Sequence, residues 1–447
     1  MDAEREFLVL GSFRRAAERV PAYRTLLREA GVRAEDIQNA QDFVRLPVLE
    51  KRNTFQRFGI KELCLDGKLG RLGSVLTSSG HSGVFAFGLN DAETVAATAK
   101  WIDDSLDYLF AVRSQPTFLI NCLPMGVKVA TQVCTLAETS VRPDMAVALV
   151  KAFGRDYAQI ILVGDTAFIK HVLELGQRGG LDWRSHRVHV IVGEEPLAEN
   201  ARTYLASILG HDSQKPQDGI VFSSMGVAEL GLNLFSEVPP MAPLVSLRRF
   251  LHENQSTRHA VFGPVESVPS LFTYDPSRIF VEFDRDGRLM VTTLDPHLRV
   301  PLVRYATGDR GRLFQFPTHL WPTFEGAGIP KQVLESIPIV VIEGRGEHAL
   351  SGKSPVYPEA VKEGVYHTPG LARLTTANFR IVSGSVSARI RIQLSPGVAP
   401  SPQFDHQFRD AIAHYVHAAI EVSCEKYELF GSGMTLDYER KFQYLGA

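Results

Sequence analysis

Short apolar runs alternate with helical stretches along the first half of the chain, and this alternation constrains the fold more than any other feature. The runs are rich in Ile and Val, as buried strands are, and apolar residues recur at near-helical spacing between them. Strands are predicted at 160–163, 188–192 and 220–222, helices at 94–110 and 198–209, and a hairpin at 279–283 with 288–292. The pattern predicts an α/β fold in which helices cover β-sheets.

The pattern changes past residue 344. A connection rich in Gly, Pro and Ser precedes predicted strands at 377–382 and 387–394 and a predicted helix at 404–420. These elements would form a small α+β domain. We therefore expect two domains, a large N-terminal domain of residues 1–343 and a small C-terminal domain of residues 344–447.

Residues 77–83 are Thr-Ser-Ser-Gly-His-Ser-Gly, between apolar residues on both sides. Glycines allow a sharp turn and close approach to a ligand, while hydroxyls and backbone N–H groups donate to phosphate oxygens. The segment is not a Walker loop, because Val84 follows Gly83 where that motif has lysine. A phosphate-binding loop and a solvated turn both remain open.

Three further segments carry candidate ligand-binding side chains. Asp309, after Tyr305-Ala-Thr-Gly, could accept two hydrogen bonds from the vicinal diol of a ribose, or belong to a β-turn. Glu229, after Met225-Gly-Val-Ala, could hold Mg²⁺, or lie in the first turn of a helix. Arg345, in Gly344-Arg-Gly, could bind an anion from a flexible linker, or mark a plain left-handed turn.

In this order and at these separations, the four segments resemble the motifs of the adenylate-forming superfamily, most closely its phenylacetate–CoA ligase branch. Segments 20–23, 29–32 and 43–51 resemble the N-terminal landmarks of that branch, and 191–197 resembles its Gly-x-Glu-Pro segment. The resemblance covers almost the whole chain. It implies the adenylate-forming enzyme fold, in which the small C-terminal domain is mobile.

The resemblance also implies a nucleotide site that uses ATP and Mg²⁺. The β- and γ-phosphates would be held by Thr77, Ser78, Ser79, Gly80, Ser82 and Gly83, the nucleotide would lie beside Gly193, Glu195, Met225 and Gly226, and Asp309 and Arg345 would bind the ribose or a phosphate. Glu229 would hold the metal and take part in catalysis. Lys441 resembles the C-terminal lysine that neutralises charge as the carboxylate attacks the α-phosphate.

Several departures from the family pattern fall on this chemistry. Val84 stands near the place of the phosphate-loop lysine, and His81 replaces a threonine, so an imidazole would be the only cation in the loop. Ala228 replaces the threonine before Glu229, Ala306 replaces an arginine, and Glu347-His348 replaces the Asp-Asp hinge. His81 is therefore the next candidate for the catalytic cation after Lys441. Arg440 and Lys426 compete with Lys441, which could also be a solvated tail charge.

The predicted activity is ATP-dependent adenylation of a small carboxylic acid, expected to be aromatic, and transfer of the acyl group to the thiol of CoA or a carrier protein, as in an acid–thiol ligase. One alternative is a relative that activates another oxyanion or uses an amine acceptor. A second is a degenerate nucleotide-binding protein without turnover. The scattered pocket residues leave the acid and the acceptor undetermined.

Composition supports an enzyme of the cytoplasm. The 447 residues are 45% hydrophobic and 22% charged, and the formal net charge of -2 argues against nucleic acid as a partner. No apolar stretch approaches the length needed to span a bilayer, and the N-terminus lacks the apolar core of a secretory signal. The four cysteines form no Cys-x-x-Cys pair, which argues against structural zinc. A homodimer is compatible with the sequence.

Overall fold

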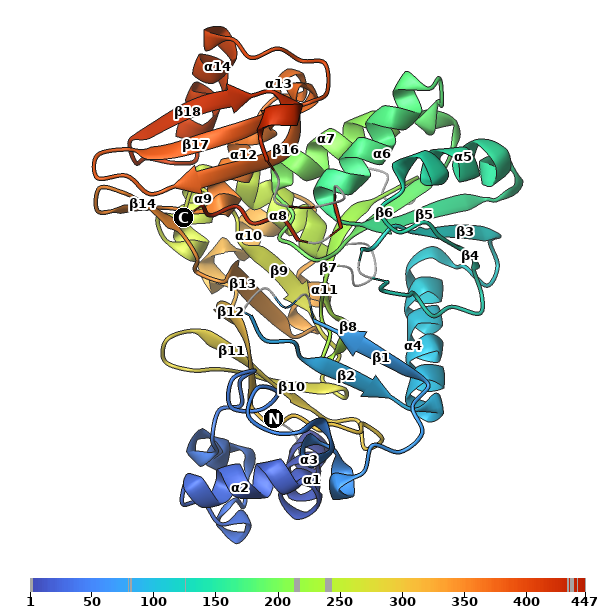
Figure 1. The fold of residues 1–447 in the computed structure, drawn as a ribbon, viewed down its shortest axis with the longest axis vertical. Helices are drawn as coiled ribbons and strands as arrows, with labels where there is room; N and C mark the ends of the chain where they lie inside the picture. The colour runs from blue at the N-terminus through green and yellow to red at the C-terminus, as the bar shows by residue number, and fades with distance from the viewer. Residues whose placement is uncertain are drawn as a thin grey trace.

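The computed structural model in Figure 1 describes the 447-residue chain apart from a few short segments. The residues it does not describe are 1–2, 79, 81–82, 125, 213–217, 238–242, 432–433, 435–437, 440 and 447. The predictions made for Ser79, His81, Ser82 and Arg440 therefore lie outside the described residues.

Within the described residues, eleven strands form one mixed sheet through the centre of the molecule (Figure 1). Their order is β10-β11-β12-β13-β9-β8-β7-β6-β5-β3-β4. The strands are β3 (Thr117–Asn121), β4 (Thr135–Glu138), β5 (Gln159–Gly164), β6 (Val188–Val192), β7 (Val221–Val227), β8 (Gly231–Ser236), β9 (Ser270–Thr273), β10 (Ile279–Phe283), β11 (Arg288–Thr293), β12 (Tyr305–Leu313) and β13 (Ile339–Gly344). Strands β3 to β7 pair in parallel and the other pairs are antiparallel.

The parallel half of the sheet is buried on both faces because successive side chains of a strand point to opposite sides. Ile160 and Leu162 of β5 pack among α5 (Pro143–Phe153), α6 (Thr166–Arg178) and α7 (Glu199–Leu209). Ile161 and Val163 pack on the other face against α4 (Ala92–Phe110) and α8 (Pro243–Glu253). The predicted strands and helices of this half are confirmed, and so is the α/β class.

The antiparallel half is also covered on both faces. Helices α1 (Ala3–Arg19), α2 (Pro21–Glu29) and α3 (Ile60–Leu63) share one apolar cluster with β10 to β13, and α8, α9 (Gln255–Phe262), α10 (Trp321–Gly326) and α11 (Lys331–Glu335) share another. The predicted hairpin is confirmed as β10 and β11, whose turn closes with a hydrogen bond from Gly287 N to Asp284 O. No helix of the described residues is long and apolar enough to cross a membrane.

After β13 the described residues form two smaller sheets and three α-helices, and we call residues 344–447 the C-terminal module (upper left in Figure 1). Its elements are β14 (Ala349–Ser351), β15 (Ser354–Val356), α12 (Pro358–Val365), α13 (Pro369–Leu374), β16 (Thr375–Val382), β17 (Ala388–Leu394), α14 (Pro402–Ala413) and β18 (Ile420–Glu425). Helix α12 packs against α7, and one apolar cluster continues from the parallel half of the large sheet into the module.

The predicted helix over residues 404–420 is wrong at its C-terminal end. Helix α14 ends at Ala413, where the N–H groups of Tyr415 and Val416 both donate to Ile412 O. Residues 420–425 instead form β18, which pairs in parallel with β17. The apolar residues at 415, 416 and 419 continue a helical spacing, but the free edge of β17 offers the following segment a ladder of backbone hydrogen bonds, so tertiary pairing overrides local pattern.

Candidate active site

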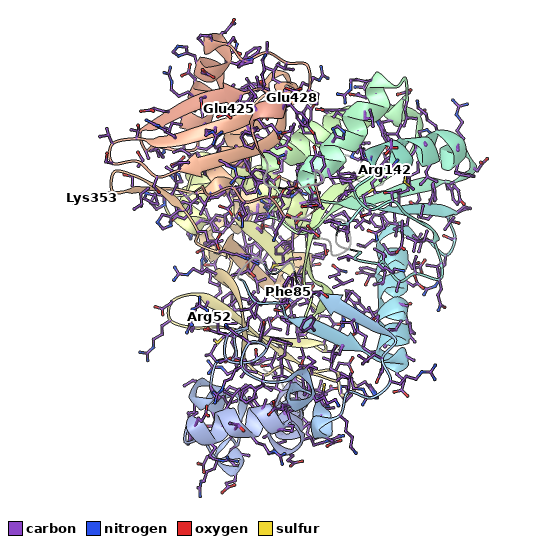
Figure 2. The ribbon with its side chains drawn as sticks, viewed as in Figure 1. Arg52, Phe85, Arg142, Lys353, Glu425 and Glu428 are labelled. Atoms are coloured by element: carbon purple, nitrogen blue, oxygen red, sulfur yellow. The ribbon has the colours of Figure 1, made fainter. Side chains whose placement is uncertain are left out.

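Strands β1 (Ser74–Thr77) and β2 (Phe87–Asn90) pair antiparallel and flank the predicted phosphate loop, and between them Ser78, Gly80 and residues 83–86 are described. Ser78 N donates to Ala86 O, and Ala86 N donates to Ser78 Oγ, both at 2.9 Å. Gly80 has a φ of 67°, where other residues are strained, and a Cβ there would lie 2.6 Å from the ring of Phe85, which would have to shift. Phe85, 54% exposed, marks the loop at the middle of the molecule in Figure 2.

These contacts assign different roles to the loop residues. Thr77 is the exposed last residue of β1, whereas the buried Ser78 hydroxyl accepts a hydrogen bond inside the loop. Gly83, with a φ of 78°, donates its N–H to Gly80 O at 2.8 Å. The glycines therefore shape the turn, and Thr77 is left facing solvent at its entrance.

Glu229 lies in the turn between β7 and β8, and not at the start of a helix. It is 6% exposed; its Oε1 accepts a hydrogen bond from Tyr305 Oη at 2.6 Å and lies 3.7 Å from Lys51 Nζ. Its other oxygen, Oε2, is buried and has no hydrogen-bond partner among the described residues. A Cβ at Gly226 would lie 3.0 Å from Asn233 N, so glycine allows the close approach of the two strands before this turn, and Met225 pairs with Phe235.

The turn that carries Glu229 touches the hairpin that carries the loop. Gly88 of β2 lies so close to Ala228 that a Cβ there would be 2.3 Å from Ala228 O. A buried carboxylate oxygen without a partner, beside a loop with the composition of an anion site, fits the preference of Mg²⁺ for one or two carboxylates together with phosphate oxygens. The chemistry of Glu229 is therefore compatible with the predicted metal.

Asp309 lies in a bulge of β12, which corrects the expectation of a strand end or a β-turn. Arg288 of β11 pairs with Arg310 and Met290 with Ala306, so β12 carries two extra residues between these pairs. Gly308 has a φ of 91° there. The Asp309 side chain lies near the segment that follows β13, where Arg345 Nε is 3.8 Å from Asp309 Oδ1.

Lys441 faces the same region from the C-terminal tail. It lines a pocket with Asp165, Glu194 and Glu195 of the large part of the chain, together with Asn378, Met434, Tyr438, Phe442 and Tyr444. Withdrawal from water lowers the pKa of Lys441, and Arg345 lowers it further, while Asp309, Glu194 and Glu195 oppose the shift. The structure thus brings Lys441, Arg345 and Asp309 together.

Two carboxylates of this pocket, Asp165 and Glu194, follow neighbouring parallel strands. Asp165 follows β5 and caps α6 by accepting from Phe168 N at 2.9 Å; burial, with Glu195 close by, raises the pKa of Asp165 to about 7. Glu194 follows β6 in a left-handed conformation, with a φ of 71°. Burial and Asp165 raise the pKa of Glu194, and Lys441 opposes that shift.

Glu195, predicted beside the nucleotide, forms its contacts with the C-terminal module. Its Oε2 accepts from Lys362 Nζ at 2.7 Å and from Tyr444 Oη at 2.9 Å. Gly193 precedes it and donates its N–H to Gly164 O at 3.0 Å, which ties the ends of β5 and β6 together. In this arrangement the Glu195 carboxylate connects the large sheet to the C-terminal module.

Sequence reasoning missed the carboxylates Asp165 and Glu194 of this pocket, and also Lys362 and Tyr444, which bind Glu195. Asp165 and Glu194 each follow a predicted strand, and the carboxyl ends of adjacent parallel strands lie at one edge of a sheet, so strand pairing could have found them. Lys362 and Tyr444 carry no local signal, because their partner is 167 and 249 residues away along the chain.

Comparison with known proteins identifies the fold. No family model matches the chain, and no curated protein matches its sequence. Among solved structures, it is similar to 2-hydroxyisobutyryl-CoA ligase in the postadenylation state with R3-HIB-AMP, at 13% identity over 99% of this chain and 89% of that chain, with a TM-score of 0.70. The same ligase in its postadenylation state with 2-HIB-AMP gives 14% identity, 100% and 89% coverage and a TM-score of 0.67.

These similarities confirm the predicted fold: the chain folds as adenylate-forming CoA ligases do. An open conformation of the same ligase, in complex with 2-HIB-AMP and CoA, covers 100% of this chain and 92% of that chain at 14% identity, with a TM-score of 0.56. The overall arrangement of this chain is thus closer to the postadenylation structures than to the open one.

Proposed function

We propose that the protein is an ATP- and Mg²⁺-dependent ligase that adenylates a small carboxylic acid and passes the acyl group to a thiol of CoA or a carrier protein. The observation that carries the proposal is the convergence of Asp309, Arg345 and Lys441 on one region, in a chain with the fold of adenylate-forming enzymes. We further propose that the domains are residues 1–343 and 344–447, with the hinge after Glu343.

Each of these side chains would have a distinct task. The Asp309 carboxylate, 14% exposed, would accept hydrogen bonds from both hydroxyls of a ribose, and Arg345 beside it would bind the ribose or a phosphate oxygen. Lys441, in a site withdrawn from water, would neutralise the charge that develops when a carboxylate oxygen attacks the α-phosphorus and pyrophosphate leaves. Catalysis would rest on positioning and charge, without a protein nucleophile.

At the other end of the site, residues 77–83 would hold the β- and γ-phosphates. Glu229 would hold Mg²⁺ through the buried oxygen that has no partner among the described residues, and Tyr305 would orient the carboxylate through its hydrogen bond to Oε1. The bound ion would supply charge neutralisation of the triphosphate. Gly193, Glu195, Met225 and Gly226 would line the nucleotide between the two ends.

In the second half-reaction, the thiol would attack the acyl carbonyl and AMP would leave with one oxygen of the original carboxylate. We propose that the C-terminal module rotates for this step and carries Lys441 away. The substrate would be a small, aromatic acid, as the resemblance to phenylacetate–CoA ligases implies.

Pyrophosphate release tests the proposal. The protein is incubated with MgATP and, separately, each member of a panel of aryl, short-chain and hydroxy acids. Release that depends on one class of acid, with AMP as the second product, supports the ligase. The absence of release with every acid, in a protein that still binds ATP by calorimetry, would instead indicate a nucleotide-binding protein without turnover.

A further inference from the structure

Helix α7 begins without a cap of its own. The residue at its N-cap position is Ala198, and no side chain at that position accepts a hydrogen bond. The first N–H groups of a helix have no partner within the helix, and in a buried position they need an acceptor from elsewhere. For α7 that acceptor comes from a different part of the chain.

The acceptor is Glu363, on α12 of the C-terminal module. Its Oε1 accepts from Glu199 N at 2.8 Å, and its Oε2 accepts from Asn200 N at 3.0 Å. The side chain of Asn200 completes the contact by donating to Glu363 O at 2.9 Å and to Tyr415 Oη at 2.8 Å. Glu363 is 1% exposed, so the carboxylate is fully enclosed between α12 and α7.

This geometry fixes the module relative to the large sheet. Two N–H groups of one helix turn, each bound to a different oxygen of one carboxylate, define both the position and the direction of α12 at the start of α7. A negative charge at this place also interacts favourably with the positive end of the helix dipole. Both partners would be solvated if the module moved away, so the contact can open.

The residue next to Glu363 connects the contact to the candidate active site. Lys362 binds Glu195, which lies three residues before the N-cap Ala198 and lines the pocket of Lys441. Helix α12 therefore binds both ends of segment 195–200. Lys362 binds Glu195 at one end, and Glu363 binds the N–H groups of residues 199 and 200 at the other. The tail that carries Lys441 is held in the same place, because Tyr444 also donates to Glu195.

We propose that Glu363 is a positioning residue that latches the C-terminal module in the orientation where Lys441 faces Asp309 and Glu194. It would not touch the nucleotide or the acid. It would set the fraction of molecules that are competent for adenylation, and releasing it would free the module for the second half-reaction. The kinetic part of this inference rests on the proposed function, whereas the docking part does not.

The test is Glu363→Gln, which keeps the shape of the side chain but presents an NH₂ group to one of the two N–H donors. Hydrogen exchange should accelerate by at least about tenfold at the start of α7 and in α12, because a charged hydrogen bond is lost. Pyrophosphate formation should fall by about tenfold at unchanged ATP affinity. Transfer from pre-made acyl adenylate to CoA should be unchanged or faster.

Two further variants separate docking from helix stability. Ala198→Ser, added to Glu363→Gln, gives α7 a cap of its own. The double variant should regain slow exchange at the start of α7 but not in α12, and pyrophosphate formation should stay low. The matched control is Glu428→Gln, an exposed glutamate of the same module (labelled in Figure 2), which should leave exchange and both half-reactions unchanged.

The outcomes decide the proposal. Unchanged exchange in Glu363→Gln would overturn the latch, and so would full recovery of pyrophosphate formation in the double variant, because Glu363 would then act only through the stability of α7. If the wild-type protein released no pyrophosphate with any acid, the proposed function would fail, and exchange in α12 would still confirm or overturn the latch.

Discussion

The two ends of the candidate active site are built in different ways. At the phosphate end, Tyr305 and Lys51 both contact Glu229, and all three residues belong to the large part of the chain. At the hinge end, Asp309 meets Arg345 and Lys441, which follow β13 and belong to the C-terminal module. The phosphate end therefore involves no residue of the C-terminal module, whereas the hinge end is formed jointly by the module and the large part of the chain.

This difference would allow one site to serve the two proposed half-reactions. A ligand held at the phosphate end needs no movement of the module, but the charge balance around Lys441 depends on docking. Glu194 and Asp165 line the pocket of Lys441 from the ends of β6 and β5, so the proposed rotation of the module would remove a cation from beside two carboxylates. Variants at the hinge end should therefore affect one half-reaction much more than the other.

The largest effect is expected for Lys441→Ala. Pyrophosphate formation should slow by about 10²–10³-fold, because the lost charge acts at the transition state, and ATP affinity should change little. The variant should still transfer the acyl group from pre-made acyl adenylate to the thiol. Rapid-quench assays of both half-reactions measure this.

Lys426→Ala is the matched control for Lys441, since Lys426 is an exposed lysine of the same module. It should be silent in both assays. Wild-type adenylation in Lys441→Ala, or a defect in Lys426→Ala, would remove Lys441 from the hinge end of the site.

Asp309→Ala should weaken ATP binding by at least about tenfold, because hydrogen bonds to a charged partner contribute about 1.5–3 kcal/mol each. Calorimetry with ATP and with AMP measures the change, and both nucleotides should be affected equally since both carry the ribose. Asp309→Asn keeps one acceptor oxygen and should lose less. Unchanged affinity in a folded Asp309→Ala protein would show that the bulge of β12 does not bind the ribose.

Glu229→Gln should lower the adenylation rate by about fivefold to tenfold and raise the Mg²⁺ concentration needed for half-maximal activity. AMP binding should stay as in the wild type, because AMP lacks the β- and γ-phosphates. Tyr305→Phe removes only the hydrogen bond to Oε1 and should have the smaller effect. An unaltered Mg²⁺ dependence in Glu229→Gln would contradict the metal assignment.

The smallest effect is expected for the stability of Asp165→Asn. The folded-state pKa of Asp165, about 7, lies above the ordinary value of an aspartate. The contribution of protonated Asp165 to the free energy of unfolding is therefore present at low pH and is lost as the pH rises through 7. Asparagine caps helices as well as aspartate does and carries no charge to bury. The free energy of unfolding of Asp165→Asn should therefore exceed that of the wild type by at least about 1 kcal/mol at pH 8 and by little at pH 4.

Asp91, which caps α4, has a pKa shifted in the opposite direction from that of Asp165, and its variant is compared by the same measurement of stability against pH. The Thr94 N–H group lowers the pKa of Asp91, with Arg299 contributing, so Asp91→Asn should lose stability at pH 8 and less at low pH. Thermal unfolding at both pH values measures the pair of variants. A gain at pH 8 that is no larger than at pH 4 for Asp165→Asn would contradict the account of the hinge-end carboxylates.

Much of the fold was predictable because the apolar runs and the four motifs can be recognised, in order, from the sequence itself. The pattern correctly predicted β5, β6 and the β10–β11 hairpin, whose signals are local. The pattern failed where pairing with a distant strand determines the structure. Residues of β18 follow a segment with helical spacing, but they form a strand because they pair with the edge of β17. The setting of Asp309 was also missed, because a bulge depends on the register of two strands.

For the site, the sequence indicated Asp309, Arg345 and Lys441, and the structure places them together. It could not indicate Glu363, because the two N–H groups that Glu363 binds lie about 160 residues earlier. A missing cap at Ala198 is visible in the sequence, but only the packed structure identifies what replaces it. The partners of buried charges are set by packing, which local patterns do not encode.

The most direct test of the proposed chemistry follows an oxygen atom. The acid that releases most pyrophosphate is prepared with ¹⁸O in its carboxylate and incubated with MgATP and CoA, and the nucleotide products are analysed by mass spectrometry. Attack of the carboxylate on the α-phosphorus, followed by thiol attack on the carbonyl, predicts one ¹⁸O atom in AMP. Unlabelled AMP, or label in inorganic phosphate with ADP as the other product, would contradict adenylation.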